Sequence, residues 1–224
     1  MIRRITLPVF LTLELILYIL ILTTGGEVLV ASSYGAIVLC FLFALLHIRS
    51  GDRLIIGGLL CTVMADWFLV VCSPIRQLWG MIFFLGAQGL YALRLHRPNP
   101  SPILLAARAA LTAVAVLVAV IVLGEKTDAL ALVSICYYAN LIVNIVAAFA
   151  RFRENRSFAV ALALFILCDT VIGLQMAAGV YLPIEEGSLL RRIIFMDFHL
   201  PWFFYLPSQV LIALQNFNLS SKKA

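Results

Sequence analysis

Residues 54–72 of the 224-residue chain read LIIGGLLCTVMADWFLVVC, a run of 19 residues whose one charged side chain is Asp66. A helix needs about 20 apolar residues to cross the roughly 30 Å hydrocarbon core of a bilayer. Similar runs fill most of the sequence, which is 64% hydrophobic and 12% charged, whereas soluble domains are about half apolar and a quarter charged. The composition therefore indicates an integral membrane protein and excludes disordered, coiled-coil and disulfide-scaffold classes.

The apolar runs predict eight transmembrane helices in one all-α domain that covers residues 1–224. They span approximately residues 5–23, 28–48, 54–72, 77–95, 102–123, 128–150, 158–178 and 196–215. Barrel strands would alternate lipid-facing apolar with lumen-facing polar residues, and these runs do not alternate. Asp66 and Asp169 each fall in the third helix of a four-helix half. This placement hints at two parallel repeats, residues 1–98 and 99–224.

The distribution of basic residues predicts the orientation, because cytoplasmic loops carry an excess of lysine and arginine. With eight spans, four basic residues lie on one side: Arg76, Lys126, Arg191 and Arg192. Eleven lie on the other: Arg3, Arg4, Arg49, Arg53, Arg94, Arg97, Arg151, Arg153, Arg156, Lys222 and Lys223. We therefore expect a multi-pass membrane protein with both termini in the cytoplasm. In a bacterium its location would be the plasma membrane.

Four ionisable residues lie inside the predicted spans: Glu14, Asp66, Arg108 and Asp169. Such residues are expensive in hydrocarbon and commonly mark functional sites. At a rise of about 1.5 Å per residue, both aspartates lie roughly 17 Å from the cytoplasmic face. They are candidate functional groups. The alternative is a salt bridge from either aspartate to Arg108 that only holds helices together. Asp197 and His199 rank lower, because they lie near the outer end of the last span.

Neutral polar side chains accompany the aspartates in the cytoplasmic half of the predicted bundle. These are Gln88, Asn140, Asn144, Tyr205 and Gln209. Individually, such amides serve more often as hydrogen-bond partners between helices than as ligand groups. Together they favour a cavity lined by the third, fourth, sixth, seventh and eighth spans. We expect this cavity to be closed toward the outside and open toward the cytoplasmic leaflet.

The sequence predicts no metal or other cofactor. The five cysteines all lie in predicted spans without a CxxC pair, and the three histidines are scattered. Phosphate-loop, dinucleotide and GxSxG motifs are absent from the sequence. The basic excess follows the loops of one side, so it does not indicate a nucleic-acid partner. If the chain is an enzyme, acidic side chains and water must carry the chemistry.

Several segments resemble the YhhN-like family of eight-helix membrane proteins, which includes lysoplasmalogenase. The segments are GGLLCTVMAD at 57–66, QGLY at 88–91, LFILCD at 164–169 and YLPSQVLIAL at 205–214. The sequence departs from the family pattern at Ala65, at Cys168 and at Gln88, where the family tends to have glycine, serine and histidine respectively. Both aspartates are kept.

The resemblance implies hydrolysis of the vinyl ether bond of a lysoplasmalogen, a lysophospholipid of the membrane. The products would be a fatty aldehyde and a glycerophosphoethanolamine or glycerophosphocholine. Vinyl ethers hydrolyse by proton transfer to carbon, so the site needs an acid and a nearby negative charge for the resulting cation. Asp66 and Asp169 are the expected catalytic pair. The residues expected to position water or substrate are Glu14, Gln88, Tyr91, Arg108, Asn140, Asn144, Tyr205 and Gln209.

Two other functions fit the same residues. Buried carboxyl groups also serve as proton relays, so a proton-coupled carrier of a lipid or small metabolite is one alternative. A non-catalytic membrane scaffold is the other, and its aspartates would be replaceable without loss of function.

Overall fold

The computed structural model describes residues 2–49, 51–97, 101–178, 184–196 and 198–222, so Asp197 lies outside the described residues. It confirms the all-α class, with 87% helix. The elements are α1 (Ile2–Thr23), α2 (Gly26–Leu46), α3 (Arg53–Asp66), the π-helix η1 (Trp67–Val71), α4 (Gln77–His96), α5 (Pro102–Leu123), the 3₁₀ turn η2 (Gly124–Lys126), α6 (Ala129–Ala150), α7 (Phe152–Ala177), α8 (Leu189–Ile194) and α9 (Leu200–Lys222).

Seven helical segments of the described chain are long and apolar enough to cross a membrane, which indicates a multi-pass integral membrane protein. They correspond to the first seven predicted spans. The predicted eighth span corresponds to α9, which is not among them. Four polar side chains of this helix are buried inside the protein: Ser208, Gln209, Gln215 and Asn216. A helix surrounded by protein can carry such residues, because its neighbours rather than lipid solvate them.

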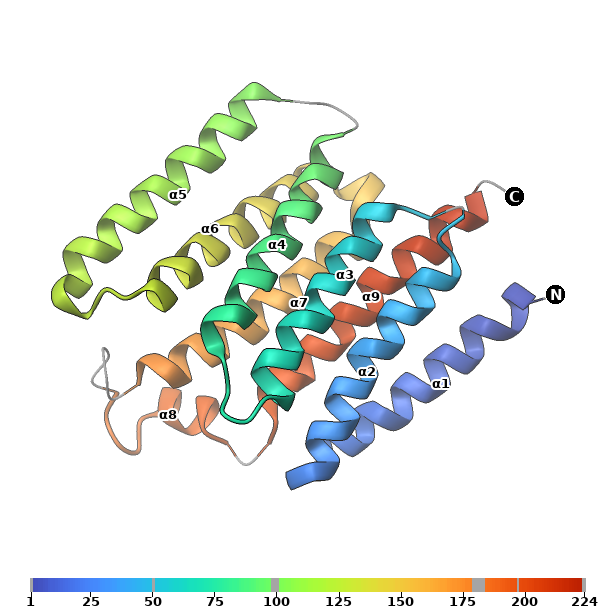
Figure 1. Cartoon of the computed structure of the whole chain (residues 1–224), viewed down its shortest axis with the longest axis horizontal. Helices are drawn as coiled ribbons and strands as arrows, with labels where there is room; N and C mark the ends of the chain where they lie inside the picture. Colours follow the sequence, from blue (N-terminus) through green and yellow to red (C-terminus); the bar gives the residue numbers. More distant parts are fainter. Residues whose placement is uncertain (1, 50, 98–100, 179–183, 197, 223–224) are drawn as a thin grey trace.

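Five helices form the centre of the bundle. Neighbours in this ring pack in the order α3, α4, α6, α7 and α9, and α9 closes the ring against α3. Helix α2 packs outside α3 and α9, and α1 packs mainly on α2. Helix α5 lies along α6 at the opposite edge of the molecule (Figure 1). The arrangement places α1 and α5 at the periphery and leaves the ring to build an interior.

The bundle has two chemically different ends. Helix α1 begins and α9 ends at the same end (Figure 1), which we call the terminus end. There the Asp52 carboxylate lies 3.4 Å from Arg94 Nε, and the Asp52 N–H donates to Asn216 Oδ1 at 2.9 Å. The opposite end, which we call the loop end, carries the connections 72–76 and 124–128 together with α8. At this end the His199 ring lies 3.1 Å from the Thr24 carbonyl oxygen.

The third and seventh predicted spans differ from continuous helices. The α3 helix gives way to the π-helix η1 directly after Asp66, so the backbone widens at the residue that carries the carboxyl group. Such π-turns are rare and often accompany functional sites. Helix α7 begins six residues before the predicted start, at Phe152, and contains a non-helical backbone at Asn155 with φ −123°. Hydropathy does not detect this first turn, because it is rich in charged residues.

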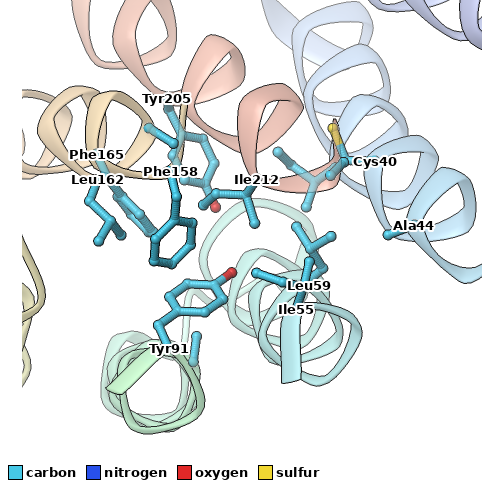
Figure 2. Packing of buried hydrophobic residues seen from close by; sticks show 14 of the residues in the cluster. Cys40, Ala44, Ile55, Leu59, Tyr91, Phe158, Leu162, Phe165, Tyr205 and Ile212 are labelled. Atoms are coloured by element: carbon cyan, nitrogen blue, oxygen red, sulfur yellow. The ribbon is translucent and has the colours of Figure 1, made fainter. Parts of the chain in front are cut away.

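The terminus-side half of the ring is filled by large side chains. Tyr91, Phe158, Phe165, Leu162 and Ile212 are fully buried and converge from α4, α7 and α9 (Figure 2). The Tyr91 and Phe158 rings meet edge to face, with centroids 5.5 Å apart. This packing leaves no room for a side chain at position 58, because a Cβ built on Gly58 would lie 2.2 Å from Tyr91 Cε1.

We expect Gly58→Ala to lower the thermal unfolding temperature of the purified protein in detergent, because the added methyl overlaps a buried ring. Overpacking of this kind costs about 1–3 kcal/mol. Gly89→Ala is the matched control, since a Cβ at Gly89 on α4 has no neighbour within 4 Å. Equal unfolding temperatures for the two variants would contradict the packing described for Tyr91.

Candidate active site

A cavity of about 390 Å³ lies inside the five-helix ring. Its size falls in the range of small-molecule sites, roughly 300–1,000 Å³. The wall is mostly apolar and includes Leu69, Met81, Phe84, Ile172 and Trp202. Its polar groups come from different helices: Asp66, Gln77, Ser134, Tyr137, Tyr138, Asp169 and Tyr205. The five helices that line the cavity are those expected from the sequence.

The structure brings Asp66 and Asp169 to this cavity, although 103 residues separate them along the chain. Asp66 is 3% exposed and accepts a hydrogen bond at its Oδ2 from the Tyr205 hydroxyl, 2.7 Å away. Asp169 accepts a hydrogen bond at its Oδ2 from the Tyr137 hydroxyl. Each carboxyl group is therefore held by a tyrosine from another helix of the ring, α9 for Asp66 and α6 for Asp169.

The second oxygen of each carboxyl group remains available. Within the described ranges, no hydrogen bond reaches Asp66 Oδ1 or Asp169 Oδ1, and neither side chain has a cationic partner. The alternative of a structural salt bridge to Arg108 is therefore wrong. Two carboxyl groups that line one cavity without a cation can act as acid and base toward one ligand.

The predicted direction of the cavity is also wrong. Its outer lining residues are Ile75 and Gln77 near the start of α4, Leu130 near the start of α6, Met176 near the end of α7 and Pro201 near the start of α9. All of these lie at the loop end. The terminus-side half, where we expected the opening, holds the buried aromatic side chains. The depth of polar residues along the helices was the basis of that prediction. Depth does not show on which side of these residues large side chains fill the bundle.

Arg108 takes part in a polar network outside the cavity lining. Its Nη1 donates to Asn140 Oδ1 and its Nη2 to Asn144 Oδ1, both at 2.7 Å. The Asn144 Nδ2 in turn donates to Gln88 Oε1 at 2.9 Å. These contacts connect the peripheral helix α5 through α6 to α4. The structure gives these four residues partners within the protein and does not place them with the aspartates.

Three further residues predicted to position substrate are buried away from the cavity lining. The Gln209 amide atoms and the Tyr91 hydroxyl have no hydrogen-bond partner among the described residues. Glu14 lies between α1 and α2, where its Oε1 accepts a hydrogen bond from Cys40 Sγ at 3.3 Å. Of the eight residues predicted to position water or substrate, Tyr205 is the one that lines the cavity with the aspartates.

The sequence analysis missed several residues of the cavity, above all Tyr137. Tyr137 precedes Asn140 by three residues and therefore shares a face of α6 with it, so helical spacing could have identified it. Tyr138 also lines the cavity, and its hydroxyl lies 2.7 Å from Thr170 Oγ1. Cys168 lies in the wall beside Asp169. In the part of the chain that the structure describes, no cluster of three metal-ligating side chains occurs.

Comparison with known protein families matches residues 28–216 to the model of the YhhN family. The chain belongs to the YhhN family. This match covers the whole five-helix ring except the last turns of α9, and it includes both aspartates and both tyrosines that hold them. Searches of curated proteins and of solved structures found no match.

The Arg108 network predicts a structural effect for Arg108→Met. The change removes two hydrogen bonds to a charged group, each worth about 1.5–3 kcal/mol, and leaves the Asn140 and Asn144 oxygens without their donor. We expect a lower thermal unfolding temperature for the purified protein in detergent. Arg49→Met, at an exposed position of the terminus end, is the control. An unfolding temperature equal to that of the control would contradict the structural role of Arg108.

Proposed function

We propose that this protein is an intramembrane hydrolase that cleaves the vinyl ether bond of lysoplasmalogens. The observation that supports the proposal most strongly is the pair of carboxyl groups in one largely apolar cavity, each held by a tyrosine hydroxyl. Membership of the YhhN family is compatible with this activity. An apolar wall suits an alkyl chain, and the carboxyl groups supply the acid and the charge that vinyl ether hydrolysis needs.

In the proposed reaction, one carboxyl group transfers its proton to the second carbon of the alkenyl chain. The carbon bonded to the ether oxygen becomes part of an oxocarbenium ion, and the other carboxylate stabilises this cation. Water adds to that carbon and returns a proton to the carboxylate that donated one in the first step, so a neutral hemiacetal forms. The hemiacetal collapses to a fatty aldehyde and a free glycerol hydroxyl. The reaction consumes one water and restores both carboxyl groups, so it requires no redox cofactor.

The tyrosines have a positioning role in this scheme. Tyr205 and Tyr137 each donate a hydrogen bond to the Oδ2 atom of a carboxyl group, which leaves its Oδ1 atom for the ligand or water. Fixed hydrogen bonds of this kind orient a group before the reaction and reduce the reorganisation that the reaction needs. Aromatic packing also fixes the two tyrosines, because Phe165 packs against both Tyr137 and Tyr205, with ring centroids 6.4 and 5.4 Å away.

We expect Asp66→Asn and Asp169→Asn each to lower aldehyde release from a lysoplasmalogen by at least about 100-fold, because general acid–base catalysis contributes roughly 10²–10⁴-fold. Asparagine preserves the shape of the side chain but cannot carry the proton. Aldehyde release by purified protein in detergent is the measurement, with the unfolding temperature as a check on folding. Glu125→Gln, at an exposed position of η2, is the control. Wild-type rates in either aspartate variant would refute the proposal.

The tyrosines give a separate prediction. Tyr205→Phe and Tyr137→Phe keep the ring packing and remove one hydrogen bond to a carboxyl group each. We expect kcat to fall by roughly 10- to 100-fold, since one charge-assisted hydrogen bond is worth roughly 1.5–3 kcal/mol, while KM changes little. Because each tyrosine hydroxyl is hydrogen-bonded to a carboxyl group, its removal changes the pH at which that carboxyl group titrates. The pH profile of kcat should therefore shift in both variants. Tyr138→Phe, whose hydroxyl contacts Thr170 rather than a carboxyl group, should leave this profile in place.

A further inference from the structure

We infer that the cavity takes its ligand from the leaflet at the loop end, as a single-chain phospholipid that enters where the start of α4, the start of α6 and the end of α7 line the cavity. This inference rests on the proposed function for the identity of the lipid. It depends on three features of the described residues: the depth of the two carboxyl groups, the position of the exposed lining residues, and the packing on the other side.

The carboxyl groups lie nearer to the loop end than to the terminus end. Asp66 precedes the end of η1, Val71, by five residues, and Asp169 precedes the end of α7, Ala177, by eight. At about 1.5 Å per residue, these intervals correspond to about 8 and 12 Å. The start of α3, Arg53, is thirteen residues from Asp66, which corresponds to about 20 Å.

This depth suits a lipid that keeps its headgroup at the loop-end surface. The vinyl ether of such a lipid begins at the glycerol oxygen, at the top of the chain, so it has to sink only this short distance to reach the carboxyl groups. A lipid from the opposite leaflet would have to carry its phosphate through most of the hydrocarbon core. Charged groups at that depth cost several kcal/mol or more.

Exposed side chains mark the entrance. Ile75 is 58% exposed, Met176 is 50% exposed and Ile172 is 38% exposed, yet all three line the cavity. They are apolar, as suits passage of an alkyl chain from lipid. Arg76 is exposed between the lining residues Ile75 and Gln77, and no carboxylate of the described chain pairs with it. It places a positive charge at the level of a lipid phosphate.

The other side of the carboxyl groups is packed. Phe165 contacts Phe84, Tyr137 and Tyr205 through its ring, and it is fully buried. Phe158 and Tyr91 continue this aromatic packing toward the terminus end. An alkyl chain from that leaflet would have to displace several close-packed rings. The structure therefore favours one leaflet as the source of the ligand.

The experiment uses the full-length protein in proteoliposomes, sorted by whether a C-terminal tag is protected from or exposed to added protease. Lysoplasmalogen is added to the outside, and aldehyde is measured before the lipid crosses the bilayer. We expect release to be at least about tenfold faster when the loop end faces outward, and detergent to abolish the difference. Equal rates, or faster release with the terminus end outward, would overturn the inference.

Obstruction of the entrance provides a second test. Met176→Trp should lower kcat/KM several-fold, because the larger ring narrows the entrance. Val160→Trp is the matched control, since Val160 is 41% exposed on the same helix but lies in the terminus-side half. Equal loss in both variants, or no loss in Met176→Trp, would count against entry at this point.

A binding measurement separates failure of the entry route from failure of the reaction. In a Trp67→Phe, Trp79→Phe variant, Trp202 is the remaining tryptophan, and it lines the cavity. A brominated single-chain lysophospholipid added to the loop-end leaflet should quench its fluorescence, and the same lipid confined to the other leaflet should not. Quenching without aldehyde release by the wild-type protein would keep the entry route and refute the hydrolase. Absence of quenching would refute the entry route even if the protein were active in detergent.

Discussion

The constraint on which this structure depends is that hydrocarbon cannot solvate a carboxyl group. Asp66 and Asp169 can be kept inside a membrane-spanning bundle only where other protein groups surround them, and the five-helix ring provides such a place. Each carboxyl group receives a hydrogen bond from a tyrosine on another helix of the ring. Hydrocarbon cannot solvate a guanidinium group either, and Arg108 instead donates hydrogen bonds to two asparagine oxygens on α6. Thus the polar interior both selects which helices pack together and creates the site.

The sequence was sufficient to predict the first seven spans, the helices that line the cavity and the presence of both aspartates in its lining. Hydropathy and the helical rise determine these features. Tyr137 was missed because a tyrosine in an apolar run is more often a packing residue, although its spacing from Asn140 puts both on one face of α6. The sequence was insufficient for η1 and α8, since short elements leave no periodic pattern. The amides at 88, 140, 144 and 209 looked like cavity residues by depth alone. Their partners depend on side-chain packing, which a depth estimate does not include.

The direction in which the cavity opens was also not predictable from the depth of residues along the helices. Polar residues in the cytoplasmic half of the predicted bundle suggested a site that opens toward the termini. Large side chains such as Phe165, Phe158 and Tyr91 instead occupy that half, and the widened backbone after Asp66 lies on the side where the cavity opens. If the basic residues orient the chain as predicted, with both termini in the cytoplasm, the ligand would come from the outer leaflet. Membership of the YhhN family does not by itself determine this direction.

The central claim is that the carboxyl groups of α3 and α7 face one another across a single cavity. The most direct measurement is cross-linking of an Asp66→Cys, Asp169→Cys pair by a short thiol-bridging reagent, in a chain whose five native cysteines are replaced. Cleavage within the connection 98–100 followed by non-reducing gel analysis would show whether the two fragments stay joined. The account predicts an intramolecular bridge for this pair and none for Asp66→Cys with Leu167→Cys, whose side chain is 46% exposed on α7. Separate labelling of the two cysteines without a bridge would contradict the account.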